Sequence, residues 1–401
     1  MQARPLMPVE EALERLLALA EAAPIRDTED VALADAEGRV LARDLVASLD
    51  LPPWPNSAMD GYALRLADWQ GEPLAVSQRI FAGHAPAPLQ SGTCARIFTG
   101  APLPEGADCV EMQENVEVLE DGRVRLLEPL QVGQNVRPQG QETRVGEQVM
   151  ATGTRLGPIE LGLAATLGHA RLEVVRRVRV AVLSTGDELV EPGLPLGPGQ
   201  IYNSNRRLLA SWLQRLGCEV VDVGILADDL QRTRECLAGL GDVDLILSTG
   251  GVSVGEADYL GMALREAGEL ALWKLAIKPG KPLTFGHFRG VPVIGLPGNP
   301  ASTLVTFGLL TRPYLLRRQG VTQVAPLRFD MPAGFDWPRP GTRREYLRAR
   351  IEQGQVRIYK NQSSGVLRSA AWAEGLVEVR EGTTPRQGDS VSFIPFSELL
   401  G

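Results

Sequence analysis

Short apolar runs alternate with helical patterns between residues 178 and 318, and this alternation constrains the fold more than any other feature of the chain. Strands are predicted at 178–183, 219–223, 243–247 and 291–296, and helices at 206–216, 229–237, 259–267 and 301–316. Strands that alternate with helices predict a parallel sheet covered by helices on both faces. Ligands of such sheets bind outside the carboxyl ends of the strands.

The flanking segments have different patterns. Apolar residues recur at helical spacing over 9–20, and a second helix is predicted at 158–167. Between residues 51 and 146 short apolar runs are separated by Gly and Pro, which predicts a β-rich domain. It includes a hairpin at 116–126, where Asp-Gly favours a type I′ turn. After residue 326 the chain returns to turn-rich strands.

Charge and composition exclude several classes of protein. Lys and Arg total 41 against 49 Asp and Glu, and no stretch concentrates basic side chains without acids nearby, so binding to nucleic-acid phosphates is not expected. No uncharged apolar run reaches the roughly 18 residues of a membrane span. Glu10 and Glu11 stand where a signal peptide would be basic and apolar, so we expect a cytoplasmic protein.

Metal chemistry is limited by the same composition. The four Cys are far apart in the sequence, without a Cys-x-x-Cys pair, which argues against a zinc ribbon or a disulfide scaffold. With only three His, any metal is expected on oxygen ligands.

Glycine-containing loops follow the predicted strands of the central sheet. One is Ser184-Thr185-Gly186-Asp187-Glu188, and another runs from Ser248 through Gly250 and Gly251 to Ser253 and Gly255. Glycine lets the backbone approach a ligand closely, and successive N–H groups can bind an anion. A third turn, Leu296-Pro297-Gly298-Asn299-Pro300, stands between a strand and a helix. We expect the three turns to meet at one pocket.

Three lysines, Lys274, Lys278 and Lys281, fall within eight residues of a proline-containing segment at 273–282. Prolines keep this segment out of a helix. Lysine is a compact point charge suited to phosphate or another oxyanion. A solvated surface loop is the alternative interpretation of such a run.

Acidic residues stand among these elements. Glu188, Asp228, Asp229 and Asp258 lie just after strands or at helix starts. Helix capping is the simpler explanation for Asp228 and Asp258, because Asp is a favoured cap. Acids close to phosphate-binding lysines also suggest Mg²⁺, which takes one or two carboxylates together with substrate oxygens and water.

Six motifs occur in a fixed order along the chain: Ser57-Ala58-Met59-Asp60-Gly61-Tyr62, Thr99-Gly100-Ala101, Ser184-Thr185-Gly186-Asp187-Glu188-Leu189, Ser248-Thr249-Gly250-Gly251-Val252-Ser253-Val254-Gly255, Lys278-Pro279-Gly280-Lys281-Pro282 and Leu296-Pro297-Gly298-Asn299-Pro300. This set resembles the MoeA-type molybdopterin molybdenumtransferase family, which is related to the E domain of gephyrin. The resemblance extends over nearly the whole chain.

The resemblance implies a multidomain fold of α/β and β parts. We expect a linking α+β domain at 1–47 and 147–177, an inserted β-rich domain at 48–146, a three-layer molybdopterin-binding α/β domain at 178–325 and a β-barrel-like domain at 326–401. It implies an enzyme that inserts molybdate into adenylylated molybdopterin and releases AMP with the help of Mg²⁺. It also implies a homodimer with shared active sites, and a molybdopterin adenylyltransferase as a candidate partner.

The resemblance and the loops together give the candidate site residues. Those expected to act in catalysis are Asp60, Glu188, Asp228, Asp258, Lys274 and Lys278, and Glu188, Asp228 and Asp258 are also the candidate metal ligands. Those expected to bind substrate are Thr99, Thr185, Gly186, Ser248, Gly250, Gly251, Ser253, Lys281, Pro297, Gly298, Asn299, Arg348 and Ser364. One departure is Glu142, where the family usually has Asp.

Three alternatives remain open from the sequence. Gly251-Val252-Ser253-Val254-Gly255 fits the nucleophile elbow of a serine hydrolase, with Asp258 and His287 following, but this leaves the lysines unexplained. A molybdopterin adenylyltransferase would account for 178–318 and not for the β-rich domains. A non-enzymatic scaffold would need neither the lysines nor the acids.

Overall fold

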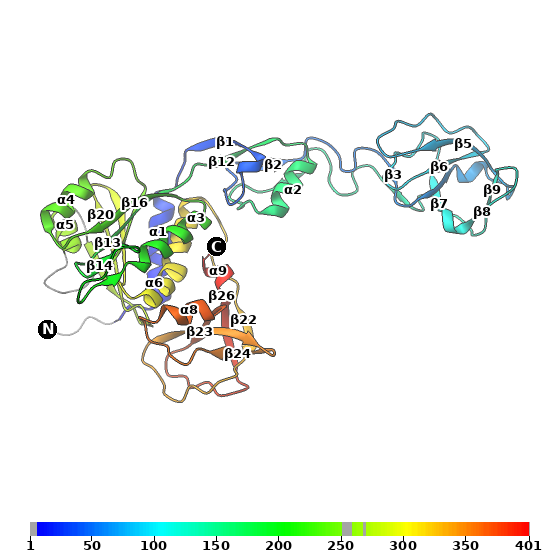
Figure 1. Cartoon of the computed structure of the whole chain (residues 1–401). Coiled ribbons are helices and arrows are strands. Elements are labelled where there is room, and N and C mark those ends of the chain that lie inside the picture. The colour runs from blue at the N-terminus through cyan, green and yellow to red at the C-terminus, as the bar shows by residue number, and fades with distance from the viewer. Residues whose placement is uncertain (1–5, 251–258, 268–269, 401) are drawn as a thin grey trace. The chain divides into compact units, whose positions relative to one another are not determined.

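The computed structural model describes residues 6–250, 259–267 and 270–400, which divide into two compact units (Figure 1). The first comprises Met1–Ala42, Gly153–Gly157 and Arg171–Gly401, and the second comprises Arg43–Thr152 and Pro158–Ala170. The finer division into four domains stays a prediction.

A six-stranded sheet with the order β16-β13-β17-β21-β20-β18 organises the first unit. Four of its strands run parallel: β16 (Glu219–Leu226), β13 (Arg179–Thr185), β17 (Leu245–Thr249) and β21 (Val291–Leu296). The prediction of a parallel sheet is confirmed for these four strands. Two antiparallel strands, β20 (Pro282–Phe288) and β18 (Leu270–Lys274), extend the sheet beyond β21.

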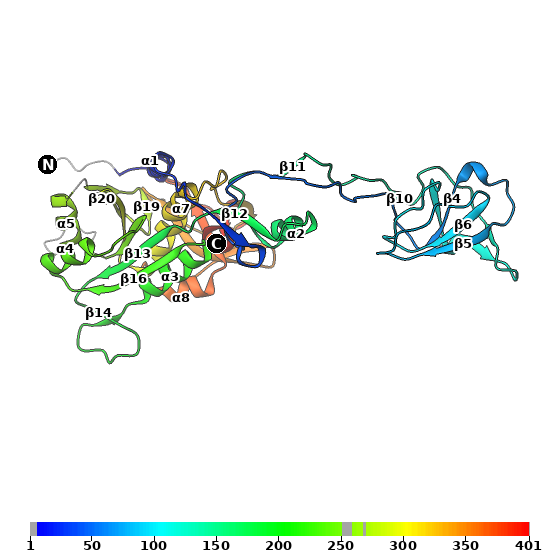
Figure 2. The same cartoon turned by 90° about the horizontal axis from the view of Figure 1, so that it is seen from above.

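Both faces of this sheet are apolar, as parallel strands require. Because side chains alternate along a strand, Val180 and Val182 pack with α1 (Val9–Ala22), α3 (Ser204–Arg215) and α6 (Pro300–Thr306). Ala181 and Leu183 face the opposite layer, formed by α4 (Leu230–Ala238) and α5 (Tyr259–Ala267). Figures 1 and 2 show α4 and α5 together on one side of the sheet.

The helix predicted at 301–316 has an irregular centre. The chain continues from α6 through a π-helical turn at Phe307–Thr311 into α7 (Arg312–Arg318). Pro313 explains the wider turn, because proline has no N–H and its ring collides with a carbonyl one turn earlier. Gly308 lies where the neighbouring Leu399 approaches, and a Cβ there would stand 3.1 Å from the Leu399 Cβ.

The last part of the first unit is a small β-barrel, as predicted. Its strands follow the order β23-β25-β26-β22, and β24 pairs with β23. A bridge between Ala333 and Val356 joins the end of β22 to β24 and closes the barrel. The bounds are β22 (Phe329–Pro332), β23 (Arg344–Glu352), β24 (Gln355–Ile358), β25 (Gly375–Val379) and β26 (Ser390–Pro395).

The second unit is β-rich, as expected. Its main sheet has the order β5-β6-β4-β7, with β4 (Gly61–Leu64), β5 (Ala75–Ile80), β6 (Thr93–Ile97) and β7 (Cys109–Met112). The predicted helix near residue 158 is α2 (Pro158–Thr166).

The predicted hairpin is β8 (Val116–Val118) with β9 (Val124–Leu126), but its turn is not type I′. The N–H of Gly122 donates to Leu119, and Gly122 has a φ of 81° while Asp121 does not have positive φ. This geometry is a three-residue loop whose last residue is left-handed, which also matches the strand twist.

None of the helices in the described residues combines the length and the apolarity needed to cross a bilayer.

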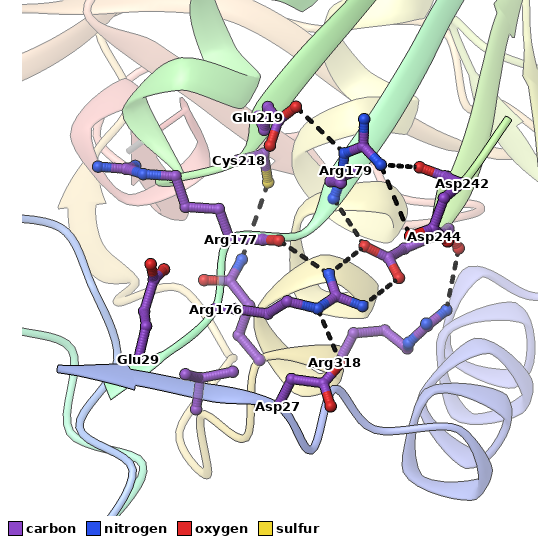
Figure 3. A network of polar contacts seen from close by, with 12 residues as sticks. Asp27, Glu29, Arg176, Arg177, Arg179, Cys218, Glu219, Asp242, Asp244 and Arg318 are labelled. Carbon is purple, nitrogen blue, oxygen red and sulfur yellow. Dashed lines mark hydrogen bonds and ion pairs between the residues drawn. The ribbon is translucent and has the colours of Figure 1, made fainter. Parts of the chain in front are cut away.

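A partly buried carboxylate, Asp244, links several elements of the first unit through hydrogen bonds (Figure 3). Its two oxygens accept from the guanidinium of Arg176 at 2.7 and 2.9 Å, and one also accepts from the Arg179 N–H at 2.7 Å. Arg318 of α7 donates to the Asp244 carbonyl. Burial alone would raise the pKa of Asp244, but these donors lower it below its usual value of 3.8.

We predict that Asp244→Asn lowers the free energy of unfolding at pH 7 by about 2 kcal/mol, because it removes the less exposed of the two carboxylates that pair with Arg176 and leaves only the exposed Asp27. The matched control is Asp242→Asn, since Asp242 is 93% exposed and lies 3.7 Å from Arg179. Its expected effect is below about 0.5 kcal/mol. Denaturant unfolding measures both.

The pH dependence has a defined sign. Because the folded pKa of Asp244 lies below the unfolded one, its stabilisation is present at neutral pH and is lost as pH falls below about 4. The difference between the wild type and Asp244→Asn should therefore shrink with acidification. A difference that grows below pH 4 would contradict this account.

Candidate active site

A pocket of about 510 Å³ opens at the carboxyl ends of the parallel strands. Ser184 of β13 is in register with Thr249 of β17, and Thr249 is in register with Leu296 of β21. The loops that follow therefore leave the sheet at one level. Residues that line the pocket include Thr185, Glu188, Asn203, Asn205, Gly250 and Gly298.

Glycines allow these loops to pack closely. Gly250 has a φ of 82°, and a Cβ there would lie 2.6 Å from the Thr185 carbonyl oxygen. A Cβ on Gly186 would lie 2.4 Å from the carboxylate of Glu188, and one on Gly298 would stand 3.8 Å from the Gly250 Cα. The convergence expected for the three turns is thus seen in the described part of each.

Neighbouring hydrogen bonds hold the turns in place. The Ser248 hydroxyl donates to the Gly250 carbonyl at 3.3 Å. The Thr303 hydroxyl donates to the Pro297 carbonyl at 2.7 Å, and the Thr303 N–H donates to the Asn299 carbonyl at 2.9 Å. Ser248 and Pro297 therefore shape the loops without lining the pocket, whereas Asn299 lines it.

Asn203 and Asn205 are pocket residues that sequence reasoning missed. Both are buried, and each has one amide atom without a hydrogen-bond partner. The hydroxyl of Thr185 has no hydrogen-bond partner either. The sequence contained a signal for Asn203, because Asn is a favoured helix cap and Asn203 caps α3 at this edge of the sheet. Caps at this edge lie beside the ligand crevice.

Acidic side chains gather beside the pocket. Glu188 lines it, and Asp187 accepts the Asp228 N–H at 3.1 Å. The pKa of Asp228 is raised, first by burial and then by the charges of Asp187 and Glu188. The expectation that Asp228 caps a helix is wrong, because Asp229 caps α4 by accepting the Arg232 N–H at 2.7 Å.

Part of the second predicted loop cannot be placed. Gly251, Ser253 and Asp258 lie outside the described residues.

Of the three lysines, Lys274 lies at the edge of the central sheet, whereas Lys278 belongs to β19 (Ile277–Lys278), which pairs with β23 of the barrel. Lys274 ends β18 opposite Pro282, and β20 then runs back along β21, so Lys274 is level with the carboxyl ends of the parallel strands. The Lys278 ammonium is 3.0 Å from the buried carboxylate of Glu345 in β23. Lys281 is exposed, and its carbonyl accepts the Leu275 N–H. The described lining of the pocket includes none of these lysines.

The barrel contributes a loop that reaches the pocket. The Ser364 carbonyl accepts the Ala301 N–H at 3.0 Å, which places Gly365 in the pocket wall. Buried Arg348 holds this loop by donating to the Ser363 carbonyl and the Ser369 hydroxyl. Burial lowers the pKa of Arg348 to about 10, and one guanidinium nitrogen, Nη1, has no partner.

Asp60 and Thr99 belong to the second unit and contact each other. Asp60 Oδ1 accepts the Thr99 N–H at 2.8 Å and the Thr99 hydroxyl at 3.1 Å, and these bonds lower the pKa of Asp60. Arg96 donates to the Gly61 carbonyl at 3.0 Å and stacks over Phe98, so it supports the same loop. Sequence reasoning did not select Arg96.

Gly61 is required where it stands. A Cβ at this position would lie 1.9 Å from the Glu111 carbonyl oxygen, closer than any side chain could tolerate. Glu142 makes a main-chain hydrogen bond to Leu51, and its exposed side chain has no contact that assigns it a role.

Comparison with known proteins covers nearly the whole chain. Three family profiles match: the MoeA N-terminal region (domain I and II) at 7–168, a probable molybdopterin binding domain at 181–317 and the MoeA C-terminal region (domain IV) at 330–396. The molybdopterin molybdenumtransferase of Haemophilus influenzae is 39% identical, covering 93% of this chain and 95% of that protein.

Two further relatives agree. Molybdopterin molybdenumtransferase 2 of Mycobacterium tuberculosis is 38% identical over 88% of this chain and 90% of its own length. The crystal structure of the molybdopterin biosynthesis protein moeA from Pyrococcus horikoshii OT3 superimposes with a TM-score of 0.83 at 30% identity, covering 98% of this chain and 100% of that one.

The central α/β sheet thus belongs to the class of probable molybdopterin-binding domains, with additional β-rich parts on either side in sequence. The chain belongs to the MoeA family of molybdopterin molybdenumtransferases, which are transferases of molybdenum cofactor biosynthesis.

The structure and the comparisons argue against the three alternatives, a serine hydrolase, an adenylyltransferase and a scaffold. His287 lies within β20 opposite Pro292, at the amino-terminal end of β21 and away from the pocket edge. That position does not suit the base of a serine hydrolase at the carboxyl edge. An adenylyltransferase or a scaffold would leave the full-length match to molybdenumtransferases unexplained.

We predict that Thr99→Val raises the pKa of Asp60 toward its ordinary value, because one of the two hydrogen bonds to the carboxylate is lost. The rise should be partial, since the backbone N–H bond is the larger cause of the shift. Titration of the carboxyl carbon by NMR measures it.

Thr93→Val is the control, because the Thr93 hydroxyl bonds to Ser77 and Gln90 in the same unit. It should leave the pKa of Asp60 unchanged. An Asp60 pKa that does not move in Thr99→Val would contradict the contact.

Proposed function

We propose that this chain inserts molybdate into adenylylated molybdopterin and releases AMP. The observation that carries the proposal is a pocket with unpaired polar atoms at the carboxyl edge of the sheet, with carboxylates beside it and Lys274 level with the same edge. Lys278 and Lys281 follow Lys274 within seven residues. In this reaction the two dithiolene sulfurs bond to molybdenum while an oxide of molybdate leaves as water with the thiol protons. A water molecule attacks the linkage between the two phosphates, so that AMP leaves and molybdopterin keeps its own phosphate.

Electrostatics explains why lysines are needed in an acidic chain. Molybdate and the two linked phosphates bring several negative charges together, and two unit charges 4 Å apart interact by about 4 kcal/mol at an effective dielectric near 20. Lys274, Lys278 and Lys281 offset this repulsion. The protein then positions the substrates and stabilises the departing phosphate, without a protein nucleophile.

Lys278 and Arg348 are cations oriented by neighbouring groups. Lys278 is tied to Glu345, and Arg348 is fixed in the barrel with one nitrogen unpaired. We propose that they bind oxyanions together with the N–H and hydroxyl groups of the Ser364 loop. Asp60, whose carboxylate is stabilised by a hydrogen bond from Thr99, would bind the pterin or the nucleotide.

Mg²⁺ fits the carboxylates beside the pocket. No three metal-ligating side chains within the described residues already form a cation site, but Mg²⁺ needs only one or two carboxylates when substrate phosphates and water complete its shell. The pKa of Asp228 is raised first by burial and then by the charges of Asp187 and Glu188, and a cation would relieve the second effect. Glu188 and Asp228, with Asp258, would hold the ion, which would neutralise phosphate charge.

We predict that Asp60→Ala and Lys278→Ala reduce molybdate-dependent AMP release by at least about 100-fold, because each removes a charged group from the reacting centre. The assay follows AMP from adenylylated molybdopterin with and without molybdate, and tungstate in parallel reports the metal preference. Lys360→Ala, at the only other lysine of the sequence, should keep full activity.

Lys278→Ala also leaves Glu345 buried without its partner, so a folding defect must be separated from a chemical one. The double variant Lys278→Ala with Glu345→Gln removes that unpaired charge. We expect it to regain stability and remain inactive. Full activity in the double variant or in Asp60→Ala would overturn the site assignment.

We also propose a homodimer in which Asp60 of one protomer serves the pocket of its partner. Co-expressed Asp60→Ala and Lys278→Ala chains should recover about a quarter of wild-type activity, since half of the dimers are mixed and each mixed dimer holds one intact site. Each variant alone should stay inactive. No recovery in purified mixed dimers would show that both residues act within one chain.

The chemistry of the substrate identifies the reaction that must precede this one. An adenylyltransferase must supply the adenylylated substrate, and we propose such an enzyme as a partner. A cytoplasmic location stays a prediction, consistent with four free thiols.

A further inference from the structure

We infer that Asn203, Asn205 and Thr185 bind the edge of an uncharged planar heterocycle. The inference rests on the proposed function, because adenylylated molybdopterin carries two such groups, the pterin and the adenine. Each has N–H donors beside a ring nitrogen or carbonyl acceptor. Neither asparagine was selected from sequence motifs.

Hydrogen bonds on the far side of each amide fix its orientation. Asn203 Oδ1 accepts the Arg206 N–H at 3.3 Å and lies 3.4 Å from the Ser184 hydroxyl, so its unpaired atom is the donor Nδ2. Asn205 Nδ2 donates to the Gly298 carbonyl at 2.6 Å, so its unpaired atom is the acceptor Oδ1. The pair therefore offers one donor and one acceptor.

Burial makes these unpaired atoms significant. Asn203 is 2% exposed, Asn205 is 6% exposed and Thr185 is 8% exposed, and all three line the pocket. A buried polar group without a hydrogen-bond partner destabilises a folded protein, so most such groups are paired. Three that share one pocket indicate a ligand that completes their bonds.

The chemistry of the lining favours a neutral ring over a phosphate. Asn205 Oδ1 needs a hydrogen-bond donor, which an ionised phosphate lacks. The described lining also includes none of the three lysines that would balance the charge of a phosphate. Leu189, Ile201 and Tyr202 add apolar and aromatic surface for the faces of a ring.

Two variants test the inference with little damage to the fold. Thr185→Val removes only the unpaired hydroxyl, so the free protein should be as stable as the wild type or more stable. Asn203→Asp keeps the oxygen that caps α3 and removes the donor, since Asp and Asn cap equally well. A merely structural role would instead lower stability and leave binding to the folded protein unchanged.

The matched control is Thr311→Val. The Thr311 hydroxyl is also buried and unpaired, but it belongs to the π-helical turn and does not line the pocket. It should change stability as Thr185→Val does and leave ligand binding unchanged.

Calorimetric titration with AMP and with a 6-substituted pterin measures binding, and thermal unfolding measures stability. We expect Thr185→Val and Asn203→Asp to weaken one of the two probes about tenfold. Loss of AMP binding assigns the pocket to the adenine, and loss of pterin binding assigns it to the pterin. Unchanged binding of both probes, equal weakening in Thr311→Val, or a wild type that binds neither probe overturns the inference.

AMP release by the wild type separates this inference from the proposed function. Wild-type release together with an unchanged KM in both variants would refute the inference alone. Absence of release from the wild type would refute the proposed function itself.

Discussion

The parallel register of β13, β17 and β21 is the constraint on which the site depends. Because Ser184, Thr249 and Leu296 are level, their loops meet at one edge, and glycines at 186, 250 and 298 let them approach within contact distance. The register is itself fixed by burial on both faces, since a shift of one residue would exchange the two layers that Val180 and Ala181 contact. Packing of the core therefore sets the geometry of the pocket.

The lysines and the neutral polar groups of the pocket lie in different places. The lysines are at the antiparallel end of the sheet and beside the barrel, where Glu345 orients Lys278. The pocket itself is lined by Glu188, by the Thr185 hydroxyl and by two buried amides. One atom of each amide is already hydrogen-bonded to the protein. Such a division suits a substrate that joins phosphates to heterocycles. The net charge of the chain gives no indication of it.

The sequence predicts the parallel strands and their helices well, because fully buried strands and amphipathic helices have strong periodicities. It does not predict the antiparallel strands β18 and β20, since they lie on either side of the segment at 273–282, where prolines and lysines obscure the strand pattern. Motifs locate the loops of the candidate site. They do not reveal Asn203, Asn205 or Arg96, whose roles depend on which hydrogen bonds remain unmade or which distant carbonyl lies nearby. The cap at Asp229 rather than Asp228 likewise depends on where α4 begins.

The central claim is that the pocket at the carboxyl ends of the parallel strands receives the substrate. A crystal structure of the protein with adenylylated molybdopterin bound tests it most directly. The account predicts density for a planar ring beside Thr185, Asn203 and Gly298, with phosphates directed toward the lysines. Density confined to another cavity, such as the one lined by Arg15, Trp273 and His287, would contradict it.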